Sequence, residues 1–182
     1  MAAAKRLFIE HANLKSGEFN QRSANRMLRG GVCGILGFGN VGVATARLMR
    51  AFGMKIHAIN RRGASDEPTD WIATTDLLDE MLRVADVLVI SAALTTITEG
   101  LIGARELGLM KENAILINVA RGEIIDEGAL YAHLVSHALF RRHRPVVGGA
   151  GAAWPLRDGL PIPRPPERDR LAAQFGRRWG MA

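Results

Sequence analysis

The sequence predicts an α/β protein built on a doubly wound parallel sheet with helices on both faces. Short apolar runs rich in β-branched residues alternate along the chain with segments of helical period. The glycine-rich stretch GFGNVG, residues 37–42, joins the first apolar run to the first long helical segment. At 182 residues, the chain can bury one core of this kind, and a second full domain is not expected. We therefore expect one Rossmann-type sheet, incomplete at its last strands.

The first half of the chain predicts a strand, a helix and a second strand in that order. A helix over residues 3–14 comes first and is followed by a polar connection. The apolar runs at residues 30–38 and 54–60 are short enough for buried strands. Between them, apolar residues at helical spacing predict a helix over residues 40–52, which Gly53 ends.

The second half continues the same alternation. The expected elements are a helix capped by Thr75 or Asp76, a strand over 86–91, a short helix over 104–110, a strand over 113–120, and a helix capped by Asp126. Consecutive strands separated by helices pair in parallel, because each helix returns the chain to the same edge of the sheet.

The glycine-rich stretch at residues 37–42, called the glycine loop below, has the spacing G-x-G-x-x-G. Gly37 permits a tight turn, Gly39 lets the backbone approach a pyrophosphate, and Gly42 lets the helix pack closely on the strand. Free N–H groups at the helix N-terminus can bind the phosphates. The alternative is a glycine-rich turn without a ligand. The expected cofactor contacts in this stretch are Gly37, Phe38, Gly39, Asn40, Val41 and Gly42.

The end of the second strand bears on the choice of cofactor. A carboxylate at this position hydrogen-bonds the ribose of NAD and repels the extra phosphate of NADP. Here Asn60 is followed by Arg61 and Arg62. A neutral amide beside two guanidiniums favours NADP over NAD, because guanidiniums bind phosphate through charge-assisted hydrogen bonds. The alternative is a solvated basic loop that contacts no ligand.

The net charge of +6 belongs to the end of the chain. Residues 141–182, called the tail below, hold nine arginines and three acidic residues, so residues 1–140 are neutral overall. The tail has no lysine and six of the seven prolines, which argues against a nucleic-acid partner. The single cysteine fits a reducing compartment. No apolar run has the length of a membrane span or signal peptide, so we expect a cytoplasmic protein without a membrane partner.

Two long stretches carry a family resemblance. GGVCGILGFGNVGVATARLMRAFGMKIHAINR and ADVLVISAALTTITEGLIGARELGLMKENAILINVARGEIIDEGAL resemble the D-isomer-specific 2-hydroxyacid dehydrogenases over about residues 28–139. The resemblance implies an oxidoreductase that moves a hydride between NADP or NAD and a small 2-oxo acid. It also implies a possible homodimer through the nucleotide-binding domain.

The family motif N-x-A-R-G stands at residues 118–122. The resemblance makes Arg121 the catalytic residue that grips the substrate carboxylate and polarises its keto group, and adds Ala92, Val119 and Ala120 as cofactor contacts. A planar guanidinium can hold carboxylate and carbonyl oxygens together. Taken without the motif, Arg121 would be read as half of a surface ion pair.

The sequence departs from the family in several places. The family proline after the third main strand is missing from Ser91 to Leu94, and Thr96 and Glu99 stand where proline and arginine are common. The family's acid histidine and its glutamate partner have no counterpart, because His133, His137 and His143 are misplaced for that role. His133 and His137 have a spacing that can bind metal, but an exposed helix face is favoured and no metal is expected.

The expected organisation has three parts. Residues 1–27 are a connecting helix and linker from a missing substrate lobe, residues 28–140 are the dinucleotide-binding domain, and the tail is anomalous and disordered. Read one base later, residues 142–150 can encode the family pattern G-I-D-x-W-W-x-E-P. The missing glutamate and histidine would then lie at the codons of Gly149 and Ala173. We therefore expect a frameshifted tail; a divergent disordered tail is the alternative.

These features leave two functional hypotheses open. In the first, the chain is a truncated 2-hydroxyacid dehydrogenase that is itself inactive. In the second, it is a non-catalytic dinucleotide-binding fragment with a basic tail.

Overall fold

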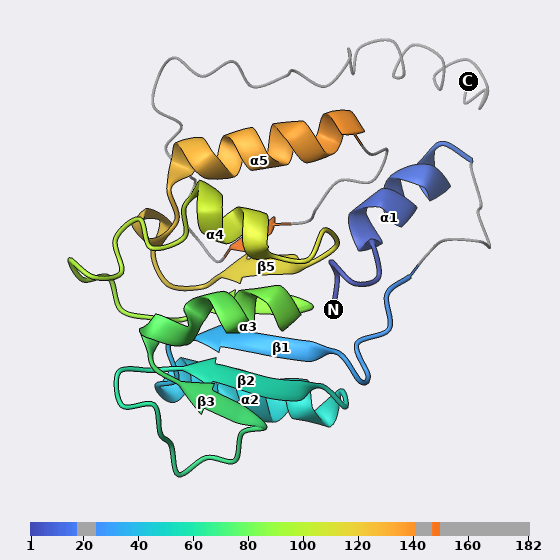
Figure 1. Cartoon of the computed structure of the whole chain (residues 1–182). Helices are drawn as coiled ribbons and strands as arrows, with labels where there is room; N and C mark the ends of the chain where they lie inside the picture. The colour runs from blue at the N-terminus through green and yellow to red at the C-terminus, as the bar shows by residue number, and fades with distance from the viewer. Residues whose placement is uncertain (18–24, 141–146, 150–182) are drawn as a thin grey trace, which may run out of the picture. The chain divides into compact units, whose positions relative to one another are not determined.

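The computed structural model describes residues 1–17, 25–140 and 147–149 (Figure 1). Its centre is a six-stranded parallel sheet with the strand order β3-β2-β1-β4-β5-β6. The strands are β1 (Val32–Leu36), β2 (Lys55–Ile59), β3 (Trp71–Ala73), β4 (Val87–Ile90), β5 (Ile115–Asn118) and β6 (Val147–Gly149). The predicted doubly wound α/β class is confirmed.

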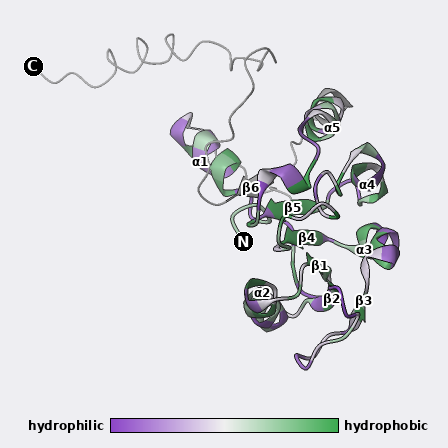
Figure 2. Cartoon of the chain, turned by 90° about the vertical axis from the view of Figure 1, so that its left-hand side faces the viewer, coloured by the Kyte–Doolittle hydropathy of each residue, from purple (hydrophilic) through white to green (hydrophobic). Residues whose placement is uncertain are grey.

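Helices cover both faces of the sheet (Figure 2). The α-helices are α1 (Leu7–Lys15), α2 (Asn40–Ala51), α3 (Leu78–Val84), α4 (Ala104–Leu109) and α5 (Glu127–Phe140), and short 3-10 turns span Thr75–Leu77 and Gly122–Ile124. α2 lies on one face, whereas α3, α4 and α5 lie on the other. No helix in the described part of the chain is long and apolar enough to cross a bilayer.

Two hydrophobic cores follow from the alternation of side chains along the strands. On β4, Val87 and Val89 point to the core under α2, whereas Leu88 and Ile90 point to the core under α3 to α5. All four are nearly or fully buried. Because successive strand residues face opposite sides, a strand between two helical layers must be apolar at every position. This is why the short apolar runs predicted buried strands correctly.

Three local features differ from the sequence prediction. β3 was not expected, because three residues at a sheet edge are too short to show a period. Neither Thr75 nor Asp76 caps α3: these residues form the 3-10 turn, and the helix N-cap is Leu77. By contrast, Asp126 caps α5 as predicted, since its Oδ1 accepts a hydrogen bond of 2.6 Å from the Ala129 N–H.

The third difference is β6. We expected strands to end by residue 140, yet Val147–Gly149 pairs in parallel with β5 and extends the sheet by one strand. This strand contradicts the expected disorder of the tail at residues 147–149. The other residues of the tail lie outside the described residues.

The amino ends of the strands are joined by Asp86, at the start of β4. Its Oδ2 accepts a hydrogen bond of 2.8 Å from the Val32 N–H. Its Oδ1 accepts one of 2.6 Å from Arg26 Nη2 and one of 3.0 Å from Lys111 Nζ. Partial burial raises the pKa of Asp86, but the Val32 N–H and the two cations outweigh it and hold the pKa below its ordinary value. Asp86 thereby ties the segment before β1 to two neighbouring strands.

Candidate dinucleotide site at the carboxyl ends of the strands

The candidate site lies where the strands end in register. Leu36 of β1 is level with Ile59 of β2 and with Ile90 of β4, and Ile90 is level with Asn118 of β5. The residues that follow these strands therefore share one edge, called the carboxyl edge below. The chain runs outward from β1 through β2 to β3 and then returns to β4 on the other side of β1. Doubly wound sheets bind ligands at such a reversal.

The glycine loop fills the reversal point between β1 and β4. Gly37 has a φ of +96°, and a Cβ there would lie 2.4 Å from the Ala92 nitrogen. A Cβ at Gly42 would lie 2.3 Å from the Gly37 carbonyl oxygen. A Cβ at Gly39 would meet no atom within 4 Å. Gly37 and Gly42 are therefore required by packing, whereas the absent side chain at Gly39 leaves open space that a ligand can occupy.

The N-terminus of α2 faces this space. Gly39 is the N-cap and provides no side-chain cap, and the first helical hydrogen bond runs from the Val43 N–H to the Gly39 carbonyl at 2.8 Å. The N–H groups of the first turn have no acceptor within the helix. Asn40 and Val41 are exposed, whereas the Phe38 side chain is buried in the core. Only the backbone of Phe38 is thus suited to contact a ligand. The arrangement fits a pyrophosphate.

Asn60 uses its side chain to shape the loop after β2. Its Oδ1 accepts hydrogen bonds of 2.9 Å from the Arg62 N–H and 2.8 Å from the Gly63 N–H. Its Nδ2 donates to the Ala64 carbonyl at 2.9 Å. Arg61 and Arg62 are exposed, and within the described ranges their side chains make no hydrogen bond or ion pair. Residues 60–64, called the basic loop below, therefore present two guanidiniums available to an anion.

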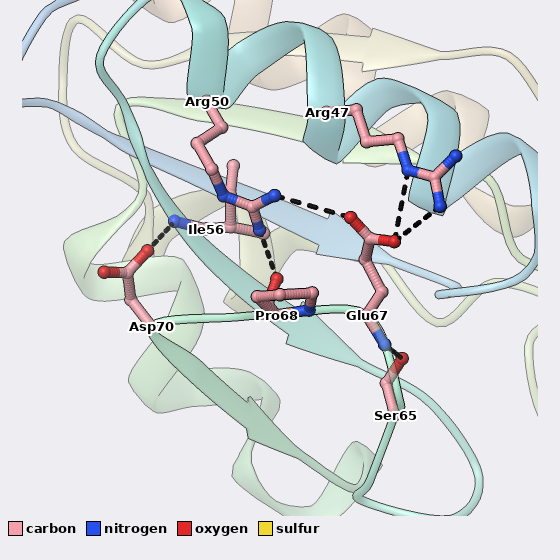
Figure 3. A network of polar contacts seen from close by, with 7 residues as sticks. All are labelled: Arg47, Arg50, Ile56, Ser65, Glu67, Pro68 and Asp70. Carbon is pink, nitrogen blue, oxygen red and sulfur yellow. Dashed lines mark hydrogen bonds and ion pairs between the residues drawn. The ribbon is translucent and has the colours of Figure 1, made fainter.

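A second pair of arginines is already engaged (Figure 3). Arg47 on α2 donates to Glu67 Oε2 from Nε at 3.1 Å and from Nη2 at 2.7 Å. Arg50 donates to Glu67 Oε1 at 3.4 Å and to the Pro68 carbonyl. The hydrogen bond from Arg47 is the main reason that the pKa of Glu67 lies below its ordinary value. These contacts hold the segment before β3 against α2 and occupy both guanidiniums.

The N-x-A-R-G segment turns directly after β5. Asn118 Oδ1 accepts a hydrogen bond of 2.9 Å from the Ala120 N–H, and its Nδ2 donates to the Arg121 carbonyl at 2.8 Å. Val119 donates its N–H to the Ile90 carbonyl at 3.0 Å, so this segment stays beside the end of β4. The Arg121 side chain is exposed and donates from Nη1 to the Ala120 carbonyl at 3.0 Å. Within the described residues it forms no ion pair.

The segment after β4 contacts both parts of the site. Ala92 packs against Gly37, as the short distance to a Cβ there indicates. Gly100 donates its N–H to the Glu123 carbonyl at 2.8 Å, just past Arg121. All the proposed cofactor contacts thus lie at the carboxyl edge or in the loops that leave it.

Two features of the site were not anticipated from the sequence. One is the role of the Asn60 side chain in the basic loop, and the other is a hydrogen bond from Ser91 to Gly37. His133 lies on α5, and His143 lies outside the described residues. No group of three histidine, cysteine or carboxylate side chains suited to a metal occurs in the described part of the chain.

A parallel sheet with a glycine loop at its reversal point, followed by a helix with free N–H groups, defines a dinucleotide-binding domain. The family model for the NAD-binding domain of D-isomer specific 2-hydroxyacid dehydrogenases matches residues 1–142. The chain therefore belongs to the D-isomer specific 2-hydroxyacid dehydrogenase family. NAD(P) is the cofactor that this domain binds in the family.

Named relatives agree with this assignment. The chain is 36% identical over 138 residues to a glyoxylate reductase of Thermococcus gammatolerans, covering 71% of this chain and 41% of that protein. It is 38% identical over 137 residues to 4-methyl-2-oxopentanoate reductase A of Aspergillus oryzae, covering 75% and 41%. The crystal structure of a glycerate dehydrogenase related protein from Thermoplasma acidophilum matches with a TM-score of 0.72 and 26% identity, covering 84% and 60%. The chain thus spans less than half the length of these two curated relatives.

Proposed function

We propose that this chain is the nucleotide-binding part of an NAD(P)-dependent oxidoreductase acting on a small 2-oxo or 2-hydroxy acid. The observation that carries the proposal is the register of the strand ends. It brings the glycine loop, the basic loop and Arg121 to one edge of one sheet. Relatives that include a glyoxylate reductase and a 4-methyl-2-oxopentanoate reductase support the class of substrate.

Each part of the site has a distinct task in this proposal. The nicotinamide, when bound, supplies or accepts the hydride. The open space at Gly39 and the N–H groups of Asn40 and Val41 hold the pyrophosphate, and Ala92, Val119 and Ala120 line the path beyond it. Arg121 binds the substrate carboxylate and orients the keto carbon, because its guanidinium is exposed and has no acidic partner among the described residues.

We further propose a preference for NADP over NAD. Arg61 and Arg62 are exposed beside the end of β2, where the adenosine ribose of a bound dinucleotide lies in this fold. A carboxylate that would repel a 2′-phosphate is absent from this position, which Asn60 occupies. The Asn60 amide is engaged within its own loop, so recognition falls to the two guanidiniums.

A homodimer is the proposed assembly of the intact protein. Three exposed apolar side chains lie at helical spacing: Val41 and Leu48 on α2, and Phe52 directly after it. A contact between nucleotide-binding domains would remove such a surface from water. The alternative to an enzyme is a dinucleotide-binding domain without turnover.

Calorimetric titration of the full chain with NADPH and NADH tests the proposal. We expect binding of both, tighter for NADPH. Gly39→Ala should fold normally and bind neither well, because the added methyl enters space left for the ligand and meets no protein atom. Gly108→Ala, equally free of contacts but on α4, is the matched control and should bind as the unsubstituted chain does.

The same titration tests the cofactor preference. The double variant in which alanine replaces both Arg61 and Arg62 should lose more affinity for NADPH than for NADH. Arg47→Ala removes a guanidinium already engaged by Glu67 and should leave the ratio of the two affinities unchanged. A folded chain that binds neither dinucleotide would refute the proposed function.

A further inference from the structure

We propose that Ser91 is a positioning residue for the glycine loop and that its hydroxyl tunes the affinity for the dinucleotide. This inference rests on the proposed function. Ser91 lies directly after β4, the strand that pairs with β1 at the reversal point of the sheet.

The hydrogen bonds around Gly37 come from two different strand ends. Ser91 Oγ donates to the Gly37 carbonyl at 2.6 Å, and this contact is partly buried. The Gly37 N–H donates to the Ile59 carbonyl at 2.9 Å. Ser91 is itself fixed, because its N–H donates to the Leu36 carbonyl at 2.8 Å. The Gly37 peptide groups are therefore held by β2 on one side and by the end of β4 on the other.

The same carbonyl oxygen lies against the first turn of α2. A Cβ placed on Gly42 would be 2.3 Å from the Gly37 oxygen and 3.2 Å from Ser91 Oγ. The oxygen thus fits between the Gly42 Cα and the Ser91 hydroxyl. Nowhere in the described ranges does another group donate to it. Without the Ser91 hydroxyl, the partly buried Gly37 carbonyl oxygen has no hydrogen-bond donor. It can regain one only if the turn moves or a water molecule enters.

Movement of this turn would displace the groups proposed to bind the pyrophosphate. Gly37 and Gly42 bracket Gly39, Asn40 and Val41, so a shift at the carbonyl changes the direction of the first-turn N–H groups. The pyrophosphate is common to NADPH and NADH, whereas the 2′-phosphate belongs to NADPH alone. Ser91 should therefore affect both cofactors equally, unlike the basic loop.

The test is calorimetric titration of the full chain and its variants with NADPH and with NADH. Ser91→Ala should raise both dissociation constants by about three- to tenfold, the range for loss of one hydrogen bond. The ratio between the two constants should stay unchanged. Ser91→Thr retains the hydroxyl and should restore the affinity. Ser136→Ala, which also removes a hydroxyl bonded to a backbone carbonyl, is the matched control and should change neither constant.

The outcomes separate the two proposals. If the folded, unsubstituted chain binds neither dinucleotide, the proposed function and the role of Ser91 both fail. If it binds and Ser91→Ala binds equally well, only the role of Ser91 fails. A change in the dissociation constant of only one of the two cofactors would also contradict the proposed role of Ser91. If Ser91→Ala does not fold, Ser91→Cys, whose thiol is a weak donor of similar size, should show the same parallel weakening.

Discussion

The Arg47 guanidinium on α2 holds the Glu67 carboxylate through two hydrogen bonds, of 3.1 and 2.7 Å, to the same oxygen. This pair joins the helix after the glycine loop to the segment before β3, which pairs with β2. It also divides the basic residues near β2 into two classes. Arg47 and Arg50 stabilise the fold through ion pairs with Glu67. Arg61 and Arg62 are exposed at the carboxyl edge.

Glu67→Gln is expected to lower the stability of the domain in a pH-dependent way. The Arg47 hydrogen bond lowers the pKa of Glu67 in the folded chain, so the pair stabilises the fold above the ordinary pKa of the carboxyl group. That stability is lost as the pH falls through the lowered folded pKa. In urea unfolding, the variant should therefore have a lower free energy of unfolding than the unsubstituted chain at neutral pH, and the same free energy in strong acid. A difference that persists in strong acid would contradict this.

Asp86→Ala should destabilise the domain by about 2–3 kcal/mol, because a partly buried carboxylate that bonds one N–H and two cations is removed. Urea unfolding at neutral pH measures the loss. The control is Asp66→Ala, an exposed acid in the segment before β3, which should change stability little. Equal effects from the two substitutions would mean that Asp86 does not join the strands as described.

Cys33 should be inert in the folded protein. Its side chain is fully buried on β1, and burial raises the pKa of the thiol to about 12. Because the thiolate is the reactive form, a thiol reagent such as dithionitrobenzoate should react slowly with native protein and fast in denaturant. Rapid labelling of the native chain would show that β1 opens readily.

Turnover by the chain alone is expected to be undetectable, although the Arg121 guanidinium is exposed directly after β5. Catalysis also needs a proton donor to the keto oxygen, and His133 lies on α5 rather than after β5. The check is NADPH oxidation with glyoxylate or hydroxypyruvate. Robust activity that disappears in Arg121→Ala would overturn the expectation and favour a working dehydrogenase.

The reading frame of the tail can be checked directly in the gene. We expect one extra base near the codons of residues 140–142, and a shifted frame that runs on through Trp-Trp, Glu-Pro and Pro-His. The family model matches residues 1–142. Early stop codons in the shifted frame would contradict the expectation, and the tail would then be treated as genuine protein sequence.

The sequence was informative where one local pattern determines structure. β1 and β4 are buried on both faces, so each appears as an apolar run, and Gly53 ends α2 with a φ of +76° as predicted. β3 and the start of α3 depend instead on pairing with β2 and on a 3-10 turn. Neither leaves a periodic signal in the residues themselves.

The candidate site divides in the same way. The glycine loop could be located from its spacing, because Gly37 and Gly42 are each required by packing and Gly39 leaves space for a ligand. The contact between Ser91 and Gly37 joins residues 54 positions apart, and the interactions of Asn60 depend on the path of its loop. Both arise from tertiary geometry, which composition and spacing do not contain.

The two ends of the strands have different roles in this sheet. Asp86 and its partners hold the amino ends of the strands together. The glycine loop, the basic loop and Arg121 lie at the carboxyl ends. Substitutions in the loops at the carboxyl ends of the strands can therefore change ligand preference, while the contacts of Asp86 at the amino ends stay unchanged. Such a scaffold tolerates exchange of its loops among related proteins, and grafting a neighbour's loops onto this chain would be a practical route to new specificity.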